Sequence, residues 1–121
     1  MLFIYGTLRK GGRNRQIIEP FLKSSTEAHA TGNLYKCGKY PLFYPNGVTN
    51  IVGELVELID EEKAFEKLDP FEGPEYVREK ITVTSGGKNI EAWTYICANL
   101  NLLGSSTLIE SGDWLEFMTA K

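Results

Sequence analysis

Two segments of the sequence carry groups that could act on a substrate, and the first is Tyr5-Gly6-Thr7-Leu8. It comes at the end of the apolar run from Met1 to Tyr5, which predicts a strand covered on both faces. A strand that ends in a glycine turn leaves backbone N–H groups unpaired, and basic residues follow at 9–15. Such donors suit a carboxylate or a developing oxyanion. A glycine turn is also ordinary loop structure, so the segment needs a catalytic partner to count as a site.

The second segment, Leu68 to Gly73, contains a carboxylate that could move a proton. Glu72 follows Phe71 and precedes Gly73, in the predicted connection from a helix to a strand. An aromatic neighbour that excludes water disfavours the charged carboxylate and raises its pKa towards the range of a general base. The alternative interpretation is a surface glutamate in a turn after a helix.

Other catalytic chemistries lack their parts in this sequence. His29 is the only histidine, so a histidine-based metal cluster lacks its typical ligands. Its small and polar neighbours favour a strand residue over the base of a Ser-His-Asp triad. The phosphate-binding and nucleophile-elbow motifs are absent. Cys37 and Cys97 lack CxxC spacing, and we expect them to pack as small apolar residues. We therefore expect no metal and no cofactor. A carboxylate and a loop of donors suit an intramolecular acyl transfer, in which the substrate supplies its own nucleophile.

The composition excludes several classes of protein. The 121 residues predict a single domain, 1–121, and the net charge of −3 gives no electrostatic case for nucleic-acid binding. No apolar stretch approaches the roughly 20 residues that span a bilayer, and the N-terminus does not resemble a secretory signal. We therefore expect a soluble cytoplasmic protein that has no membrane partner.

The elements that must position these groups are mostly strands. We expect strands at 1–5, 28–35, 50–59, 76–84 and 89–98, and a short helical face within 16–23 that Pro20 limits. One clear helix begins at the cap Asp60, buries Ala64, Phe65 and Leu68, and ends at Asp69-Pro70. We also expect a turn at 45–47, a loop at 100–106 and a closing turn at 111–114. The pattern predicts an α+β fold, a small closed or partly closed β-barrel with flanking helices.

The order and spacing of these motifs resemble one known family across most of the chain. The resemblance rests on Tyr5-Gly6-Thr7-Leu8 with Gly12 and Asn14, Gly32 to Tyr35, Tyr44-Pro45, Val52 to Leu55, Leu68-Asp69-x-Phe71-Glu72-Gly73-x-x-Tyr76-x-Arg78, and Gly112-Asp113-Trp114. Together they are similar to the gamma-glutamylcyclotransferase-like family, especially its small gamma-glutamylamine cyclotransferases and YtfP-type bacterial proteins. Arg15 departs from the family pattern, since a histidine often follows the asparagine there, and so does Pro70.

The resemblance implies a mixed barrel of about six strands with flanking helices. It also implies that Tyr5, Gly6, Thr7 and Leu8 bind a γ-glutamyl substrate, and that Glu72 is the general base that helps to release 5-oxoproline without a cofactor. The alternative is a non-catalytic module that binds a small metabolite in the same pocket. Several points stay open: the departing amine or amino acid, whether the native substrate is a free metabolite or a biosynthetic intermediate, the oligomeric state, and the roles of Arg15, Arg78 and Tyr95.

Overall fold

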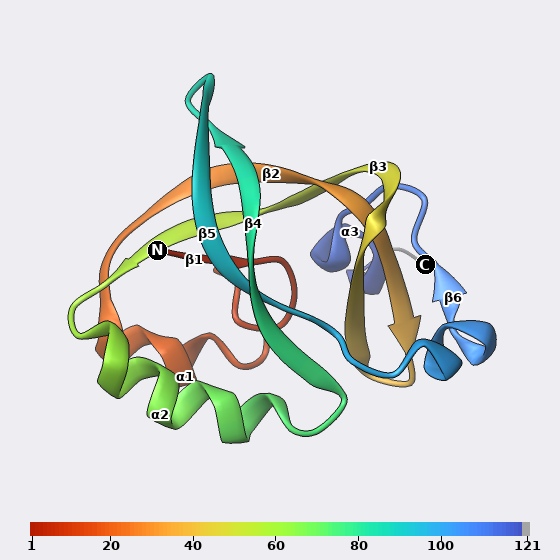
Figure 1. Cartoon of the computed structure of the whole chain (residues 1–121), viewed down its shortest axis with the longest axis horizontal. Coiled ribbons are helices and arrows are strands. Elements are labelled where there is room, and N and C mark those ends of the chain that lie inside the picture. The colour runs from red at the N-terminus through yellow and green to blue at the C-terminus, as the bar shows by residue number, and fades with distance from the viewer. Residues whose placement is uncertain (120–121) are drawn as a thin grey trace.

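The computed structural model describes residues 1–119 as six strands with short helices around them (Figure 1). The strands are β1 (Leu2–Ile4), β2 (Leu22–Cys37), β3 (Tyr40–Leu58), β4 (Tyr76–Ser85), β5 (Lys88–Cys97) and β6 (Thr107–Leu108). The α-helices are α1 (Arg15–Ile18), α2 (Glu61–Glu72) and α3 (Trp114–Thr119), and the 3₁₀ helices are η1 (Glu19–Phe21) and η2 (Leu100–Ser105). Figure 1 shows α1 and α2 at one end of the molecule, with α3 and β6 at the other.

The strands form one mixed sheet that closes into a ring. Their order is β3-β1-β5-β4-β2-β6, and β2 also pairs with β3, so the row from β3 to β2 closes on itself. The pairing of β1 with β5 is parallel, while the other pairings are antiparallel. The predicted α+β fold, with a mixed sheet of six strands and flanking helices, is confirmed.

Strand β1 is buried on both faces, as its apolar sequence predicts. Phe3 belongs to one core cluster, with Phe43 and Trp114, whereas Leu2 and Ile4 belong to a second cluster that includes residues of α1 and α2. Side chains alternate between the two faces of a strand, so β1 contributes to both clusters. Because β1 lies between β3 and β5, the segment that follows it starts deep inside the molecule.

The turn predicted at residues 45–47 is wrong, because β3 runs through it. The chain reverses instead at Gly38, where Cys37 pairs with Tyr40 and Gly38 has φ +62°. Further along the hairpin, Gly32 pairs with Thr49 and Asn33 with Tyr44, so residues 45–48 have no partner in β2. The Pro-Asn-Gly sequence therefore makes a bulge, because these residues fit the regular ladder poorly but tolerate an irregular backbone.

Helix α2 begins as predicted and ends later than predicted. Asp60 accepts a hydrogen bond from the backbone N–H of Lys63 at 3.2 Å, and Ala64, Phe65 and Leu68 are buried. The helix continues through Pro70 to Glu72 and ends at Gly73, whose φ of +84° favours glycine. Pro70 is exposed in the last turn of the helix. It has no backbone N–H to donate, and water can donate instead to the helix carbonyl that is left without a partner. Glu72 is therefore the last residue of the helix and not part of a connection.

Three smaller expectations have mixed outcomes. The helical face at 16–23 is limited to α1, and Pro20 lies in the 3₁₀ helix η1. The loop expected at 100–106 is largely the 3₁₀ helix η2. The closing turn is confirmed, since Gly112 has φ +69° and the Trp114 indole is buried. Within residues 1–119, no helix is long and apolar enough to cross a membrane.

Candidate active site

A cavity of about 330 Å³ brings together the two segments singled out in the sequence. Its lining includes all of Tyr5, Gly6, Thr7 and Leu8, and it includes Glu72. The Tyr5–Leu8 segment follows β1, and Glu72 is the last residue of α2. Residues far apart in the chain therefore line one cavity. A cavity of this volume suits a small metabolite.

The loop after β1 uses its carbonyl groups internally and leaves its N–H groups free. The Gly6 carbonyl accepts from the N–H of Arg9 at 3.1 Å, the Thr7 carbonyl from the N–H of Asn14 at 3.0 Å, and the Leu8 carbonyl from Arg15 Nη1 at 3.3 Å. Among the described residues, the N–H groups of Gly6, Thr7 and Leu8 have no acceptor. The loop therefore offers the cavity donors, which suit a carboxylate or an oxyanion.

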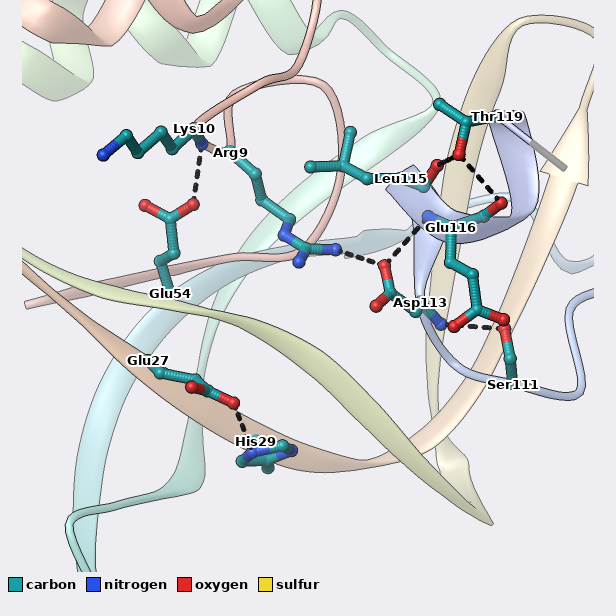
Figure 2. Close-up of polar contacts among 10 residues, drawn as sticks. All are labelled: Arg9, Lys10, Glu27, His29, Glu54, Ser111, Asp113, Leu115, Glu116 and Thr119. Carbon is teal, nitrogen blue, oxygen red and sulfur yellow. Dashed lines mark hydrogen bonds and ion pairs between the residues drawn. The ribbon is translucent and has the colours of Figure 1, made fainter.

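Ion pairs hold two of the basic residues that follow this loop, Arg9 and Arg15. Arg9 Nη1 lies 2.8 Å from Asp113 Oδ1, and the backbone N–H of Lys10 donates to Glu54 at 2.7 Å (Figure 2). Arg15 Nη1 lies 2.8 Å from the same Glu54 carboxylate. Arg9 and Arg15 do not line the cavity, so they brace the loop rather than face a ligand.

The Glu72 carboxyl is in a setting that suits proton transfer near neutral pH. Burial, followed by the nearby negative charge of Asp69, raises its pKa from 4.5 to about 7. Neither cause is a hydrogen bond, and within residues 1–119 the carboxyl has no hydrogen-bond partner. Its oxygens are therefore free to accept a proton from a molecule in the cavity.

Asp69 lies one turn before Glu72 on α2, and two side chains hold it as an anion. Arg78 donates to it from Nε at 3.0 Å and from Nη2 at 3.3 Å, and the Tyr95 hydroxyl donates at 2.6 Å. Burial alone would raise the pKa of Asp69, but these hydrogen bonds outweigh it and lower the pKa. The sequence predicted only a helix-end role for Asp69. The i, i+3 spacing of the two carboxylates is a signal that could have indicated their coupling, but it was missed because the helix was expected to end at Asp69-Pro70.

Three tyrosines around Glu72 present hydrogen-bond acceptors to the cavity. The hydroxyl of Tyr5 donates to the Tyr95 carbonyl, that of Tyr76 to the Pro41 carbonyl, and that of Tyr95 to Asp69. Each hydrogen is thus used inside the protein, and each oxygen keeps lone pairs that can accept. Burial, chiefly, and the Glu72 charge raise the pKa of all three phenols, so they stay neutral. Sequence reasoning did not identify this feature, because it depends on partners distant in the chain.

The lining of the cavity therefore offers both hydrogen-bond donors and hydrogen-bond acceptors. The free N–H groups of Gly6 to Leu8 match a carboxylate or carbonyl oxygen, and Glu72 with the three phenols matches an ammonium group. A ligand that carries both kinds of group, as an amino acid does, would satisfy both the donors and the acceptors. In the part of the chain that the structure describes, no three His, Cys, Asp or Glu residues cluster closely enough to hold a metal ion.

Known proteins resemble this chain in sequence and in fold. Residues 2–116 match the family described as "Gamma-glutamyl cyclotransferase, AIG2-like". A protein of Methanocaldococcus jannaschii, named as a proposed gamma-glutamylcyclotransferase, is 36% identical over 96% of both chains. The crystal structure of YkqA from Bacillus subtilis is 30% identical with a TM-score of 0.75, and the match covers 97% of this chain but 40% of YkqA. The solution structure of YtfP from Escherichia coli is 26% identical over 98% of both chains, with a TM-score of 0.61.

Proposed function

The chain belongs to the AIG2-like gamma-glutamyl cyclotransferase family, and we propose that it releases 5-oxoproline from a γ-glutamyl amide. The substrate's own α-amine attacks its γ-carbonyl, and Glu72 is the general base. One observation carries the proposal: a carboxyl with a pKa of about 7 lines the same cavity as three backbone N–H groups that have no acceptor within residues 1–119. The first part supplies proton transfer, and the second supplies a place for negative charge.

The proposed reaction needs no group beyond the substrate and these residues. Glu72 accepts a proton from the α-amine as its nitrogen bonds to the γ-carbon, and the γ-oxygen becomes an oxyanion. The N–H groups of Gly6, Thr7 and Leu8 stabilise that charge. The carbonyl then re-forms, the bond to the departing nitrogen breaks, and Glu72 gives this nitrogen the proton that it accepted from the α-amine. The products are 5-oxoproline and a free amine.

Two physical effects supply most of the proposed rate enhancement. Holding the flexible glutamyl chain in a curled conformation removes an entropic barrier, and well-oriented intramolecular attack is worth up to roughly 7–11 kcal/mol. An oxyanion donor in a site shielded from water contributes about 3–4 kcal/mol. The phenol oxygens of Tyr5, Tyr76 and Tyr95 support this orientation, since they favour the α-amine end of the substrate beside Glu72.

The Glu72 carboxyl has no hydrogen-bond partner within residues 1–119, and this favours the proposal over a module that only binds a metabolite. A partly buried carboxylate without a hydrogen-bond partner costs free energy, and it would weaken the binding of an anionic ligand. A general base explains why such a group faces the cavity.

The experiment that tests the proposal is incubation with a panel of γ-glutamyl amides, followed by chromatographic detection of 5-oxoproline. The wild-type protein is expected to form 5-oxoproline from at least one member. The variant Glu75→Gln is the matched control, because Glu75 is exposed, lies three residues from Glu72 and does not line the cavity. Binding of the panel without any 5-oxoproline would favour the binding module instead.

A further inference from the structure

The mouth of the cavity differs in character from its interior. Four of the lining residues are exposed, namely Arg13, Lys39, Tyr40 and Phe71, whereas the others are buried or half-buried. The mouth therefore consists of two cations and two aromatic rings. Among the lining residues that the structure describes, Glu72 is the only acidic one, and neither cation at the mouth forms an ion pair there with an aspartate or glutamate.

Arg13 is unlike the other arginines of the chain. Arg9, Arg15 and Arg78 each form an ion pair with an aspartate or glutamate. Arg13 has no carboxylate partner among the described residues, and neither has Lys39. The sequence contains four arginines, and within residues 1–119 the one at the cavity mouth is the one that forms no ion pair with an aspartate or glutamate.

Contacts within the mouth hold Arg13 in place. Its Nη2 donates to the backbone carbonyl of Lys39 at 3.1 Å, and its guanidinium carbon lies 5.5 Å from the centre of the Tyr40 ring. The first contact joins the segment after the Tyr5–Leu8 loop to the turn between β2 and β3. The second occupies a face of the Tyr40 ring, which is then less available to a cationic ligand.

We propose that Arg13 and Lys39 form a carboxylate subsite that selects the departing group of the substrate. This inference rests on the proposed function. With the glutamyl part beside Glu72 and the loop, the departing group extends towards the exposed end of the cavity. The substrate class is then a γ-glutamyl α-amino acid, whose departing nitrogen lies one carbon from a carboxylate. Two cations at the mouth attract that carboxylate and repel the ammonium of a γ-glutamyl polyamine.

The size of the effect follows from the exposure of both side chains. Charges in contact with water interact weakly and are screened by salt, with a Debye length of about 10 Å at 0.1 M ionic strength. We therefore expect a preference of about five- to twentyfold at low salt, which decreases as salt is added. The aromatic ring of Phe71 adds apolar surface at the same mouth for the side chain of the departing amino acid.

Three substrates of nearly equal size test the subsite. They are γ-glutamylalanine, γ-glutamylethylamide and mono-γ-glutamyl ethylenediamine, which differ at the end of the departing group as anion, neutral and cation. The wild-type protein is expected to show kcat/KM values in that descending order. In the double variant Arg13→Gln with Lys39→Gln, the ratio between the first two substrates should fall towards one, mainly through KM.

The matched control removes two exposed charges that do not line the cavity, as Lys67→Gln with Lys88→Gln, and should keep the wild-type preference. Equal kcat/KM values for the three substrates in the wild type, or an unchanged ratio in the double variant, would overturn the subsite while leaving the cyclotransferase proposal standing. If no substrate yields 5-oxoproline, the proposed function fails. In that case calorimetry measures the affinity of the protein for the same three compounds, and equal affinities overturn the subsite.

Discussion

The substitution Glu72→Gln is expected to make the protein more stable while it removes the proposed base. In the folded protein the pKa of Glu72 is about 7, against an ordinary value of 4.5. Each pKa unit corresponds to about 1.4 kcal/mol, so the difference of about 2.5 means that the ionised carboxylate destabilises the fold by at most about 3 kcal/mol. Glutamine has nearly the same shape and cannot ionise, so it avoids this cost.

The sign of the effect depends on pH. The folded state keeps the Glu72 proton to a higher pH than the unfolded chain does, so the free energy of unfolding of the wild type falls as pH rises from about 4.5 to about 7. Below this window the carboxyl is neutral in both states, and the wild type and Glu72→Gln should be similarly stable. Above it, the variant should be more stable by up to about 3 kcal/mol.

Urea unfolding of both proteins over about pH 4 to 8 measures this difference directly. Glu75→Gln is the control, since it also replaces a glutamate but leaves the cavity unchanged. The reasoning is refuted if Glu72→Gln is no more stable than the wild type at about pH 8, or if any gain does not depend on pH. If Glu72 had only a structural role, the Glu72→Gln protein would be less stable than the wild type.

Three further predictions concern the same cavity. The kcat/KM for 5-oxoproline formation should rise with pH around a midpoint of about 7, because a general base must be ionised to act; a rate that falls through this range in a pH series would contradict the role of Glu72. Asp69→Asn removes a negative charge that raises the pKa of Glu72, so the midpoint of the same pH–rate profile should move lower, whereas an unmoved midpoint would show that the two carboxyls are uncoupled. Gly6→Ala should lower kcat/KM at least about tenfold, because a Cβ there would clash with Cγ of Pro41 and displace the loop. Gly104→Ala is the matched control, since a Cβ there would meet nothing within 4 Å. Equal kcat/KM values for Gly6→Ala and the wild type would show that the loop tolerates the change.

Much of the fold could be predicted because the relevant patterns are local. The apolar run of β1 predicts burial on both faces, and Asp60 with the stripe of Ala64, Phe65 and Leu68 predicts the start and the buried face of α2. The sequence also predicted the Tyr5–Leu8 loop and Glu72 as two halves of one site. The structure brings them to one cavity, and their roles stay predictions.

Two local signals were misleading because the surrounding structure outweighed them. The residues Pro45 to Gly47 favour a turn, yet the long pairing between β2 and β3 resumes beyond them, so they form a bulge. Pro70 favours a helix end, but an exposed last turn tolerates it, and this adds Glu72 to α2. Glu72 is consequently held by a helix that also carries Asp69.

Some features of the site have no signature in the local sequence. The hydroxyl of Tyr76 uses its hydrogen on the carbonyl of Pro41, and Tyr95 uses its own on Asp69; these partners are 35 and 26 residues apart. Arg78, whose role the sequence left open, holds Asp69 while stacking on Phe65 at 3.8 Å. Only the closure of the ring of strands brings such groups together.

The most direct test of the central claim compares the rate of 5-oxoproline formation by the wild type and Glu72→Gln on a γ-glutamyl substrate that the wild type turns over. Calorimetry on the variant shows in parallel whether it still binds that substrate. The proposed role of Glu72 predicts retained binding and a loss of at least about a hundredfold in kcat. A Glu72→Gln protein that binds the substrate and forms 5-oxoproline at the wild-type rate would contradict it.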